Sequence, residues 1–287
     1  MSIEKTALIT GASSGFGLLT TVALAKRGWH VVATMRDLSR RDRLEAAAKE
    51  ANVLDKIEFA ALDVTNSGQV AAVAAEMAKR QQPLDALINN AGFAMAGFAE
   101  DVSDGELRKQ FDTNFFGAAA VTRALLPQFK QQGSGYIVMV SSVSGRMGFP
   151  GGSSYAASKF ALEGWSETLR FELKPMGIHV VLVEPGAFET DIWTRNADIS
   201  EGTRALQADP DSAGAARLTR WRSKMETGKP RANPQHVADL IAAILRDKNP
   251  GLRYAFGTDA WLGLMLRRLL PWSLFENLII RQTGLSK

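Results

Sequence analysis

Short apolar runs alternate with amphipathic stretches along the first two thirds of the chain. The expected strands are 6–10, 30–35, 57–64, a run ending at 90, a run ending at 142, 178–185 and 252–257. The expected helices are 15–27, 39–52, 67–81, 104–132 (disturbed at Pro127), 154–175 and 234–246. Such alternation predicts right-handed crossovers between buried parallel strands. We therefore predict an α/β fold: a doubly wound parallel β-sheet of about seven strands, with helices on both faces.

The alternation stops near Ala187. Residues 187–230 are polar and mixed, and we expect them to form a substrate-loop insertion. Residues 258–287 are apolar with basic interruptions, and Pro271 should divide them into two short helices. Because no repeat or Ser/Gly-rich linker interrupts the chain, residues 1–287 are predicted to be a single domain.

The amino-acid composition excludes several classes of functional site. The chain has no cysteine, which excludes disulfides and thiolate metal sites and fits a cytoplasmic location. Its three histidines are far apart in sequence, so neither a metal site nor a Ser-His-Asp triad is expected. A formal net charge of +4 gives no reason to expect a nucleic-acid partner. No signal peptide or membrane-spanning run is expected.

A glycine-rich turn, TGASSGFG, joins the first expected strand to the first expected helix. Glycines let such a turn approach a pyrophosphate, and the helix N-terminus favours its charge. The residues expected to contact a dinucleotide here are Gly11, Ser13, Ser14, Gly15, Phe16 and Gly17. The strand and helix on either side strengthen this interpretation over that of a simple tight turn.

The end of the second strand reads Thr34-Met35-Arg36. An NAD site usually has an acidic residue there, whereas a guanidinium can grip a 2′-phosphate. Arg36 therefore predicts NADP(H) as the cofactor. Asp37 follows directly and keeps NAD(H) open as the less favoured choice, and a solvated surface Arg36 is the alternative interpretation.

The stretch SSYAASK places Tyr155 and Lys159 four residues apart, on one face of an expected helix. A phenol titrates near ~10, and a neighbouring ammonium favours its ionised form. A tyrosine tuned in this way can exchange protons near neutral pH. The alternative is an ordinary surface pair.

Together these segments resemble the short-chain dehydrogenase/reductase family over about residues 5–190, nearest its hydroxysteroid and retinol dehydrogenase members. The family motifs TGxxxGxG, NNAG, YxxxK and PGxxxT correspond to residues 10–17, 89–92, 155–159 and 185–190. Ser142 lies thirteen residues before Tyr155, as in that family. The resemblance implies a single-domain Rossmann fold.

The resemblance also implies a catalytic set of Asn114, Ser142, Tyr155 and Lys159. Tyr155 would donate a proton to a carbonyl oxygen as hydride arrives, with Lys159 lowering the pKa of Tyr155 and holding the nicotinamide ribose. Ser142 would hydrogen-bond the substrate oxygen. Asn114 would hold a water that links Lys159 to solvent. Ser141 points away from Ser142 in an extended strand and is expected to bond locally.

Further cofactor contacts follow from the same resemblance. The implied residues are Asp63 (at the adenine), Val64, Asn90, Ala91, Gly92, Tyr155, Lys159, Pro185, Gly186 and Thr190 (at the nicotinamide carboxamide).

The expected substrate region is mostly apolar and indicates a bulky hydrophobic ketone or alcohol that is steroid-, retinoid- or lipid-like. Its candidate lining residues are Phe93, Met95, Arg146, Met147, Phe149, Phe188, Ile192, Trp193 and Trp221. Alternatively, several of these residues only pack the loop.

An NADP(H)-dependent oxidoreductase is the leading hypothesis. The alternatives are a non-enzymatic NADP(H)-binding sensor, and an epimerase or dehydratase on the same scaffold. The family resemblance implies a homodimer or homotetramer that pairs through the helices at 104–132 and 154–175. The tail at 258–287 is expected to pack on its own domain or a second subunit, with a membrane surface as the less favoured partner.

Overall fold

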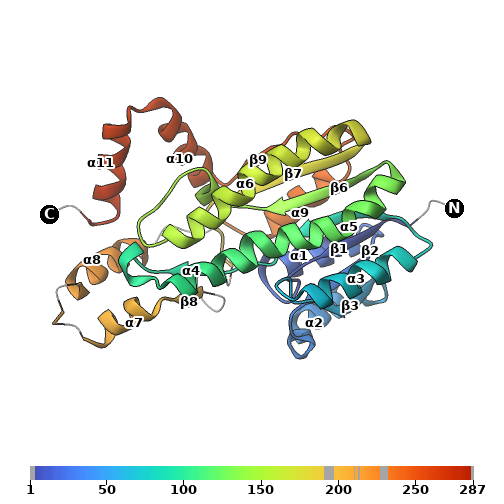
Figure 1. Ribbon diagram of the computed structural model, residues 1–287, viewed down its shortest axis with the longest axis horizontal. Coiled ribbons are helices and arrows are strands. Elements are labelled where there is room, and N and C mark those ends of the chain that lie inside the picture. The colour runs from blue at the N-terminus through green and yellow to red at the C-terminus, as the bar shows by residue number, and fades with distance from the viewer. Residues whose placement is uncertain (1–3, 191–196, 210, 213, 227–231, 286–287) are drawn as a thin grey trace.

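The centre of the protein is a seven-stranded parallel sheet with the order β3-β2-β1-β4-β6-β7-β9 (Figure 1). The computed structural model describes residues 4–190, 197–209, 211–212, 214–226 and 232–285. The strands are β1 Thr6–Ile9, β2 His30–Met35, β3 Ile57–Ala61, β4 Leu84–Asn89, β6 Gly135–Val140, β7 Ile178–Pro185 and β9 Arg253–Phe256. The strand order reverses at β1, which pairs with β2 on one side and β4 on the other. The predicted doubly wound α/β fold is confirmed.

Helices cover both faces of this sheet, and each face has its own hydrophobic core. The helices are α1 Gly15–Ala25, α2 Asp42–Glu50 and α9 Gln235–Ile244 on one face, and α3 Ser67–Lys79, α5 Ala118–Gln132 and α6 Ser153–Leu173 on the other. Strand β1 shows why both faces must be covered. Ala7 and Ile9 belong to the first core and Leu8 to the second, and all three are fully buried. Alternate residues of a strand point to opposite faces, so an apolar run needs helices on both.

The helix expected at 104–132 differs from the prediction. The structure has α4 Asp104–Phe111, a π-helical turn at Asp112–Gly117, and then α5. Helix α5 continues through Pro127, so the interruption lies at the wider turn and not at the proline. The wider turn brings Gly117 against Val64, where a side chain on Gly117 would lie 2.5 Å from Val64 Cγ2.

The region after β7 contains more structure than its polar sequence suggests. Strand β8 (Ala197–Ile199) pairs with β5 (Ala94–Ala96), and α7 (Glu201–Ala208) and α8 (Ala215–Glu226) follow. Figure 1 shows α7 and α8, with α11, at the end of the molecule opposite the N-terminus.

The tail forms two helices divided at Pro271, as predicted: α10 Thr258–Leu269 and α11 Trp272–Gln282. Ala260 and Phe275 pack against Val143 and Met147, so part of the tail lies on its own domain. Across the described ranges, none of the helices combines the length and apolar character needed to traverse a bilayer.

Candidate active site

A cleft of about 650 Å³ opens at the carboxyl ends of the central strands. Most of the residues singled out from the sequence line it together: Gly11, Ser13, Ser14, Gly15, Phe16, Arg36, Asp63, Val64, Asn90, Ala91, Gly92, Ser142, Tyr155, Lys159, Pro185, Gly186 and Thr190. Gly17 and Asn114 are not among the lining residues, and their contacts are with the residues that shape the cleft wall. Because parallel strands all end at one edge of the sheet, segments far apart in sequence meet here.

The nucleotide turn requires its glycines. Gly11 and Gly15 have φ values of +67° and +55°, in the region that favours glycine. A side chain on Gly11 would lie 2.8 Å from the Cα of Ala91, and one on Gly17 would lie 2.4 Å from the carbonyl oxygen of Gly11. The turn can therefore approach β4 and a ligand closely only because these positions lack side chains.

Two arginines line the cleft beyond β2, namely Arg36 and Arg40. Asp37 lies between them, but its carboxylate accepts a hydrogen bond from the backbone N–H of Ser39 at 2.9 Å. Hydrogen bonds with the side chain and then the backbone N–H of Ser39 lower the pKa of Asp37, so the acid caps a short helical turn as an anion. Sequence reasoning missed Arg40. Its signal is a second cation four residues after Arg36 in the polar segment that follows the strand.

Asp63 and Thr190 are fixed in the cleft wall by local contacts. Asp63 Oδ1 accepts hydrogen bonds from the backbone N–H and hydroxyl of Thr65, at 2.9 and 2.7 Å. The Thr190 Cβ lies 3.8 Å from the position that a Gly15 side chain would take, so the loop after β7 reaches the nucleotide turn.

Helix α10 also reaches this wall. Asp259, in its first turn, accepts a hydrogen bond from the backbone N–H of Ala187 at 2.7 Å. A side chain on Gly186 would lie 2.4 Å from the same carboxylate. The tail therefore fixes the loop that carries Pro185, Gly186 and Thr190.

Tyr155 and Lys159 lie one helical turn apart on α6, and both line the cleft although each is only 4% exposed. Ser142 follows β6 and its side chain is hydrogen-bonded to that of Tyr155. Ser142 Oγ also accepts a hydrogen bond from the backbone N–H of Ser144 at 3.1 Å, which fixes its position. The structure thus brings the expected serine, tyrosine and lysine together at one place on the cleft wall.

Burial dominates the electrostatics of this group. It raises the pKa of Tyr155 to about 12, against the lowering effect of the bond to Ser142. It lowers the pKa of Lys159 to about 8, against the raising effect of Glu163. The direction for Tyr155 is opposite to the one expected from the sequence, because the cost of desolvating a phenolate exceeds the lowering effect of the hydrogen bond with Ser142. Tyr155 therefore holds its proton at neutral pH, as a proton donor must.

Lys159 is oriented by the backbone. Its Nζ donates a hydrogen bond to the carbonyl oxygen of Val140 at 2.8 Å and lies 5.7 Å from the centre of the Tyr155 ring. The end of β6 therefore positions the ammonium group beside the tyrosine.

Asn114 lies in the π-helical turn and is 1% exposed. Its Nδ2 donates to the carbonyl oxygen of Phe93 at 3.0 Å and to Ser158 Oγ at 3.2 Å, and its Oδ1 accepts from the N–H of Phe93 at 3.1 Å. Asn114 therefore joins the segment after β4 to the helix that carries Tyr155. Single π-helical turns are often found at functional sites. The expected water at Asn114 stays a prediction.

Ser141 differs from the expectation. Among the described residues, its buried hydroxyl has no hydrogen-bond partner, so the predicted local bond is wrong. A side chain on Gly145 would lie 3.0 Å from Ser141 Oγ, so the hydroxyl lies next to a position that has no side chain.

The expected substrate-lining residues divide into two groups. Phe93 and Phe188 line the cleft. Three others are not among the cleft-lining residues: Arg146 pairs with Glu184, Met147 packs against Gly263, and Trp221 packs against Gly151.

The remaining candidates are not cleft-lining residues either. Met95 is buried and Phe149 packs against the cluster under the tail, while Ile192 and Trp193 lie outside the described residues. Large apolar side chains of a loop are as well suited to packing as to substrate contact, and their sequence does not separate the two uses.

Comparison with known proteins identifies the family to which this fold and site correspond. The family model described as short chain dehydrogenase matches residues 5–200. The chain is 41% identical over 278 residues to the uncharacterized oxidoreductase YusZ of Bacillus subtilis, covering 96% of this chain and 97% of that protein. It is 38% identical over 253 residues to human retinol dehydrogenase 8, covering 87% of this chain and 80% of that protein.

Solved structures show the same fold. A short-chain dehydrogenase from Streptomyces avermitilis superimposes with a TM-score of 0.77 and 37% identity, covering 96% of this chain and 95% of that one. A short chain dehydrogenase from Burkholderia cenocepacia, solved in complex with NADP, gives a TM-score of 0.74 at 24% identity, covering 97% and 99%. From the matched family model, these likenesses and the fold, the chain belongs to the short-chain dehydrogenase family of oxidoreductases.

Proposed function

We propose that the protein is an NADP(H)-dependent oxidoreductase that interconverts a ketone or aldehyde with the corresponding alcohol on a bulky hydrophobic substrate. The observation that carries the proposal is the placement of Ser142, Tyr155 and Lys159 on the wall of the cleft that begins at the glycine turn. A proton donor and a dinucleotide site in one cleft are the two parts that carbonyl reduction needs.

In the reductive direction, NADPH supplies the hydride when it is bound. The Ser142 hydroxyl hydrogen-bonds the substrate carbonyl oxygen, where negative charge develops. The Tyr155 hydroxyl gives its proton to that oxygen, so the product gains one C–H bond and one O–H bond. Lys159, whose pKa is lowered to about 8 by burial against the raising effect of Glu163, lies 5.7 Å from the Tyr155 ring centre and is the group that we expect to supply a proton to the phenolate. In the oxidative direction the proton moves from the alcohol to Tyr155.

The preference for NADP(H) is supported by the charges beyond β2. Arg36, Asp37 and Arg40 all line this part of the cleft, and the Asp37 carboxylate is bonded to Ser39. Guanidinium groups are suited to bind a 2′-phosphate bidentately, and a carboxylate pointing at it would repel it. The NADP bound to the Burkholderia structure is consistent with this assignment.

The hydrophobic substrate class is supported by Phe93 and Phe188 in the cleft and by the relative named retinol dehydrogenase 8. Hydrophobic and aromatic side chains supply most of the lining in pockets that bind apolar ligands. The cysteine-free composition fits a cytoplasmic protein.

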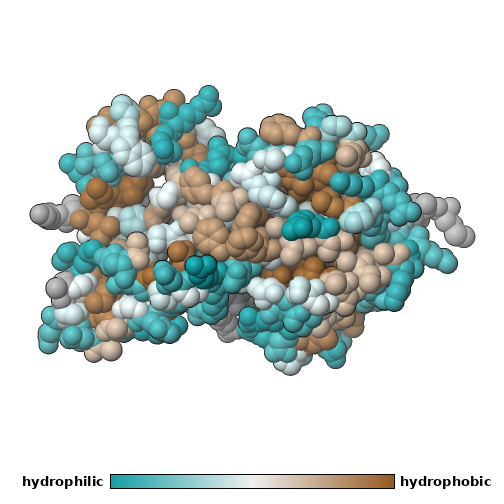
Figure 2. Space-filling view, in the orientation of Figure 1, coloured by the Kyte–Doolittle hydropathy of each residue, from teal (hydrophilic) through white to brown (hydrophobic). Residues whose placement is uncertain are grey.

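A homodimer or homotetramer is part of the same proposal. Phe116, Phe160 and Phe171 are exposed, at 57%, 47% and 70% of their surface, on the π-helical turn and α6. Figure 2 shows hydrophobic residues across the face where α5 and α6 lie. Exposed aromatic groups gathered in this way are typical of a surface that a partner covers.

The proposal is tested by following NADPH and NADH oxidation over a panel of ketones, quinones, retinoids and steroids. We expect stoichiometric NADPH consumption with at least one hydrophobic carbonyl compound. Tight NADPH binding with no turnover on any compound would favour a sensor. Substrate conversion without net NADPH consumption would favour an epimerase or dehydratase.

A further inference from the structure

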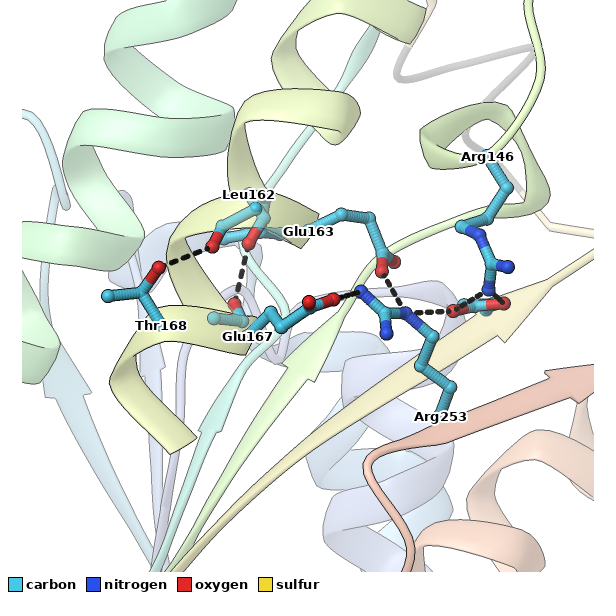
Figure 3. Close-up of polar contacts among 9 residues, drawn as sticks. Arg146, Leu162, Glu163, Glu167, Thr168 and Arg253 are labelled. Carbon is cyan, nitrogen blue, oxygen red and sulfur yellow. Dashed lines mark hydrogen bonds and ion pairs between the residues drawn. The ribbon is translucent and has the colours of Figure 1, made fainter. Parts of the chain in front are cut away.

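A cluster of charged side chains begins one helical turn after Lys159, at Glu163 of α6 (Figure 3). It consists of Glu163 and Glu167 on α6, Glu184 on β7, Arg253 on β9, and Arg146 after the turn that follows β6. We call these five residues the carboxylate cluster. Figure 3 shows Arg253 beside the carboxylates of Glu163 and Glu167, with Arg146 farther from α6.

Arg253 holds the cluster together. Its Nε lies 2.9 Å from Glu163 Oε2 and 3.4 Å from Glu184 Oε1, and its Nη2 contacts Glu167 Oε2. Arg146 Nη1 lies 3.2 and 3.3 Å from the two oxygens of Glu184. The Glu163 and Glu184 side chains are 5% and 0% exposed, whereas Glu167 is 43% exposed. The cluster therefore has a buried carboxylate pair and a solvated outer member.

Glu163 is the member that faces the catalytic group. It follows Lys159 by one helical turn, and its charge raises the pKa of Lys159 against the larger lowering effect of burial. A side chain on Gly145 would lie 2.8 Å from Glu163 Cγ and 3.1 Å from the Lys159 carbonyl oxygen, so Gly145 keeps this space open. Among the described residues, Glu163 Oε1 has no hydrogen-bond partner. The carboxylate is thus bound to Arg253 through one oxygen, while its other oxygen is buried without a hydrogen-bond donor among these residues.

The buried ammonium group of Lys159 needs a compensating negative charge. Its ammonium group has three N–H donors, is 4% exposed, and bonds the carbonyl oxygen of Val140. A buried cation is costly unless an anion compensates it. The charged and titratable groups around it are Tyr155 and Glu167 on α6, Glu184 on β7, Arg253 on β9 and Arg146 after β6. Of all the charged groups here, Glu163 is the one whose charge acts on Lys159, and it favours the ammonium form against the lowering effect of burial.

We propose that Glu163 is a positioning residue that acts through Lys159. Its carboxylate, which shares Arg253 with that of Glu184, stabilises the ammonium form of Lys159. Glu184 modulates this effect, because a second carboxylate strengthens the negative field when it is ionised and weakens it when it is protonated. Burial, with the charge of Glu163 next, raises the pKa of Glu184 to about 7, so the change falls near neutral pH. The effect of Glu163 on catalysis rests on the proposed function, whereas its effect on the protonation of Lys159 does not.

The test is an NMR titration of the full-length protein without cofactor, labelled at the lysine side chains. The Lys159 resonance is identified by its loss in Lys159→Gln. In Glu163→Gln, which keeps the size and a hydrogen-bond acceptor, we expect the pKa of Lys159 to fall by about one to three units. Glu167→Gln is the matched control, since it removes a carboxylate from the same arginine one turn farther away, and it should shift Lys159 by less than about 0.3 unit.

An unchanged Lys159 pKa in Glu163→Gln, or an equal shift in Glu167→Gln, would overturn the proposal. If Glu163→Gln does not fold, Glu184→Gln decides: a fall of about half a unit or more supports the proposal and no fall overturns it. Once a substrate is found, the pH profile of kcat/KM should move in the same direction in Glu163→Gln. The titration reads Lys159 directly, so it gives a result even if the reductase assignment is wrong.

Discussion

The side-chain amide of Asn90 donates hydrogen bonds to the backbone carbonyl oxygen of Gly11, at 3.0 Å, and to that of Thr10, at 2.9 Å. The residue after β4 thus fastens the turn after β1. A side chain on Gly17 would lie 2.5 Å from the same Asn90 nitrogen. The third glycine of the turn is therefore needed for packing between strand and helix.

Gly17→Ala should destabilise the protein by about 1–3 kcal/mol, because the added methyl group overlaps Gly11 O and Asn90 Nδ2. It should also weaken NADPH binding through the displaced turn. Urea unfolding and NADPH fluorescence measure the two effects. Gly164→Ala is the control: it adds the same methyl group inside α6, where no atom lies within 4 Å, and should be neutral or stabilising by up to ~1 kcal/mol.

Tyr155→Phe should lower turnover by about 10²–10⁴-fold, because the proton donor is lost while the ring is kept. NADPH affinity, followed by fluorescence titration, should change little. Tyr136→Phe is the control. Its hydroxyl donates to the carbonyl oxygen of Asp247 at 2.9 Å, away from the cleft, and its removal should leave turnover unchanged. Wild-type rates from the Tyr155 variant would refute the assigned donor.

Arg36→Ala and Arg40→Ala should each lower kcat/KM for NADPH by about 10–100-fold, since each removes a charged hydrogen-bond donor for the 2′-phosphate. Values for NADH should stay within about twofold. Arg41→Ala serves as the comparison, because Arg41 pairs with Glu45 and does not line the cleft. Equal losses with both cofactors would contradict the assignment of these arginines.

The pH dependence of the free energy of unfolding should include a contribution from Glu184. Burial raises its pKa from 4.5 to about 7. The folded state therefore binds more protons than the unfolded state between these pH values, and the free energy of unfolding falls as pH rises through this window. The loss is at most about 3 kcal/mol.

Glu184→Gln should remove that part of the slope, whereas Glu167→Gln should keep it. Urea unfolding of the three proteins between pH 4.5 and 8 makes the comparison. Parallel pH dependences for the wild type and Glu184→Gln would show that Glu184 does not titrate in this range.

The regular part of the fold could be predicted because its signals are local. Strands β2 and β7 were expected at the bounds that the structure has, since each is an apolar run ended by polar residues, glycine or proline. The three-residue strands β5 and β8 could not be found, because pairing across the chain makes them strands and their composition does not. The π-helical turn leaves no mark in an amphipathic pattern.

In the site, too, some features could be predicted from the sequence and others could not. Motif spacing was enough to bring Ser142, Tyr155 and Lys159 together, because strand ends share one edge of the sheet. Their pKa directions were not accessible, since these depend on burial. Arg253 and Glu163 are 90 residues apart, and in a sequence a buried carboxylate looks the same as a solvated one.

The bond between Asp259 and the backbone of Ala187 spans 72 residues of chain. During synthesis the Ala187 loop leaves the ribosome well before the helix that fastens it. The cleft wall is thus completed only when nearly the whole polypeptide has emerged. Nascent or C-terminally shortened chains should accordingly accumulate with a folded sheet and an incomplete cleft wall at residues 186–190.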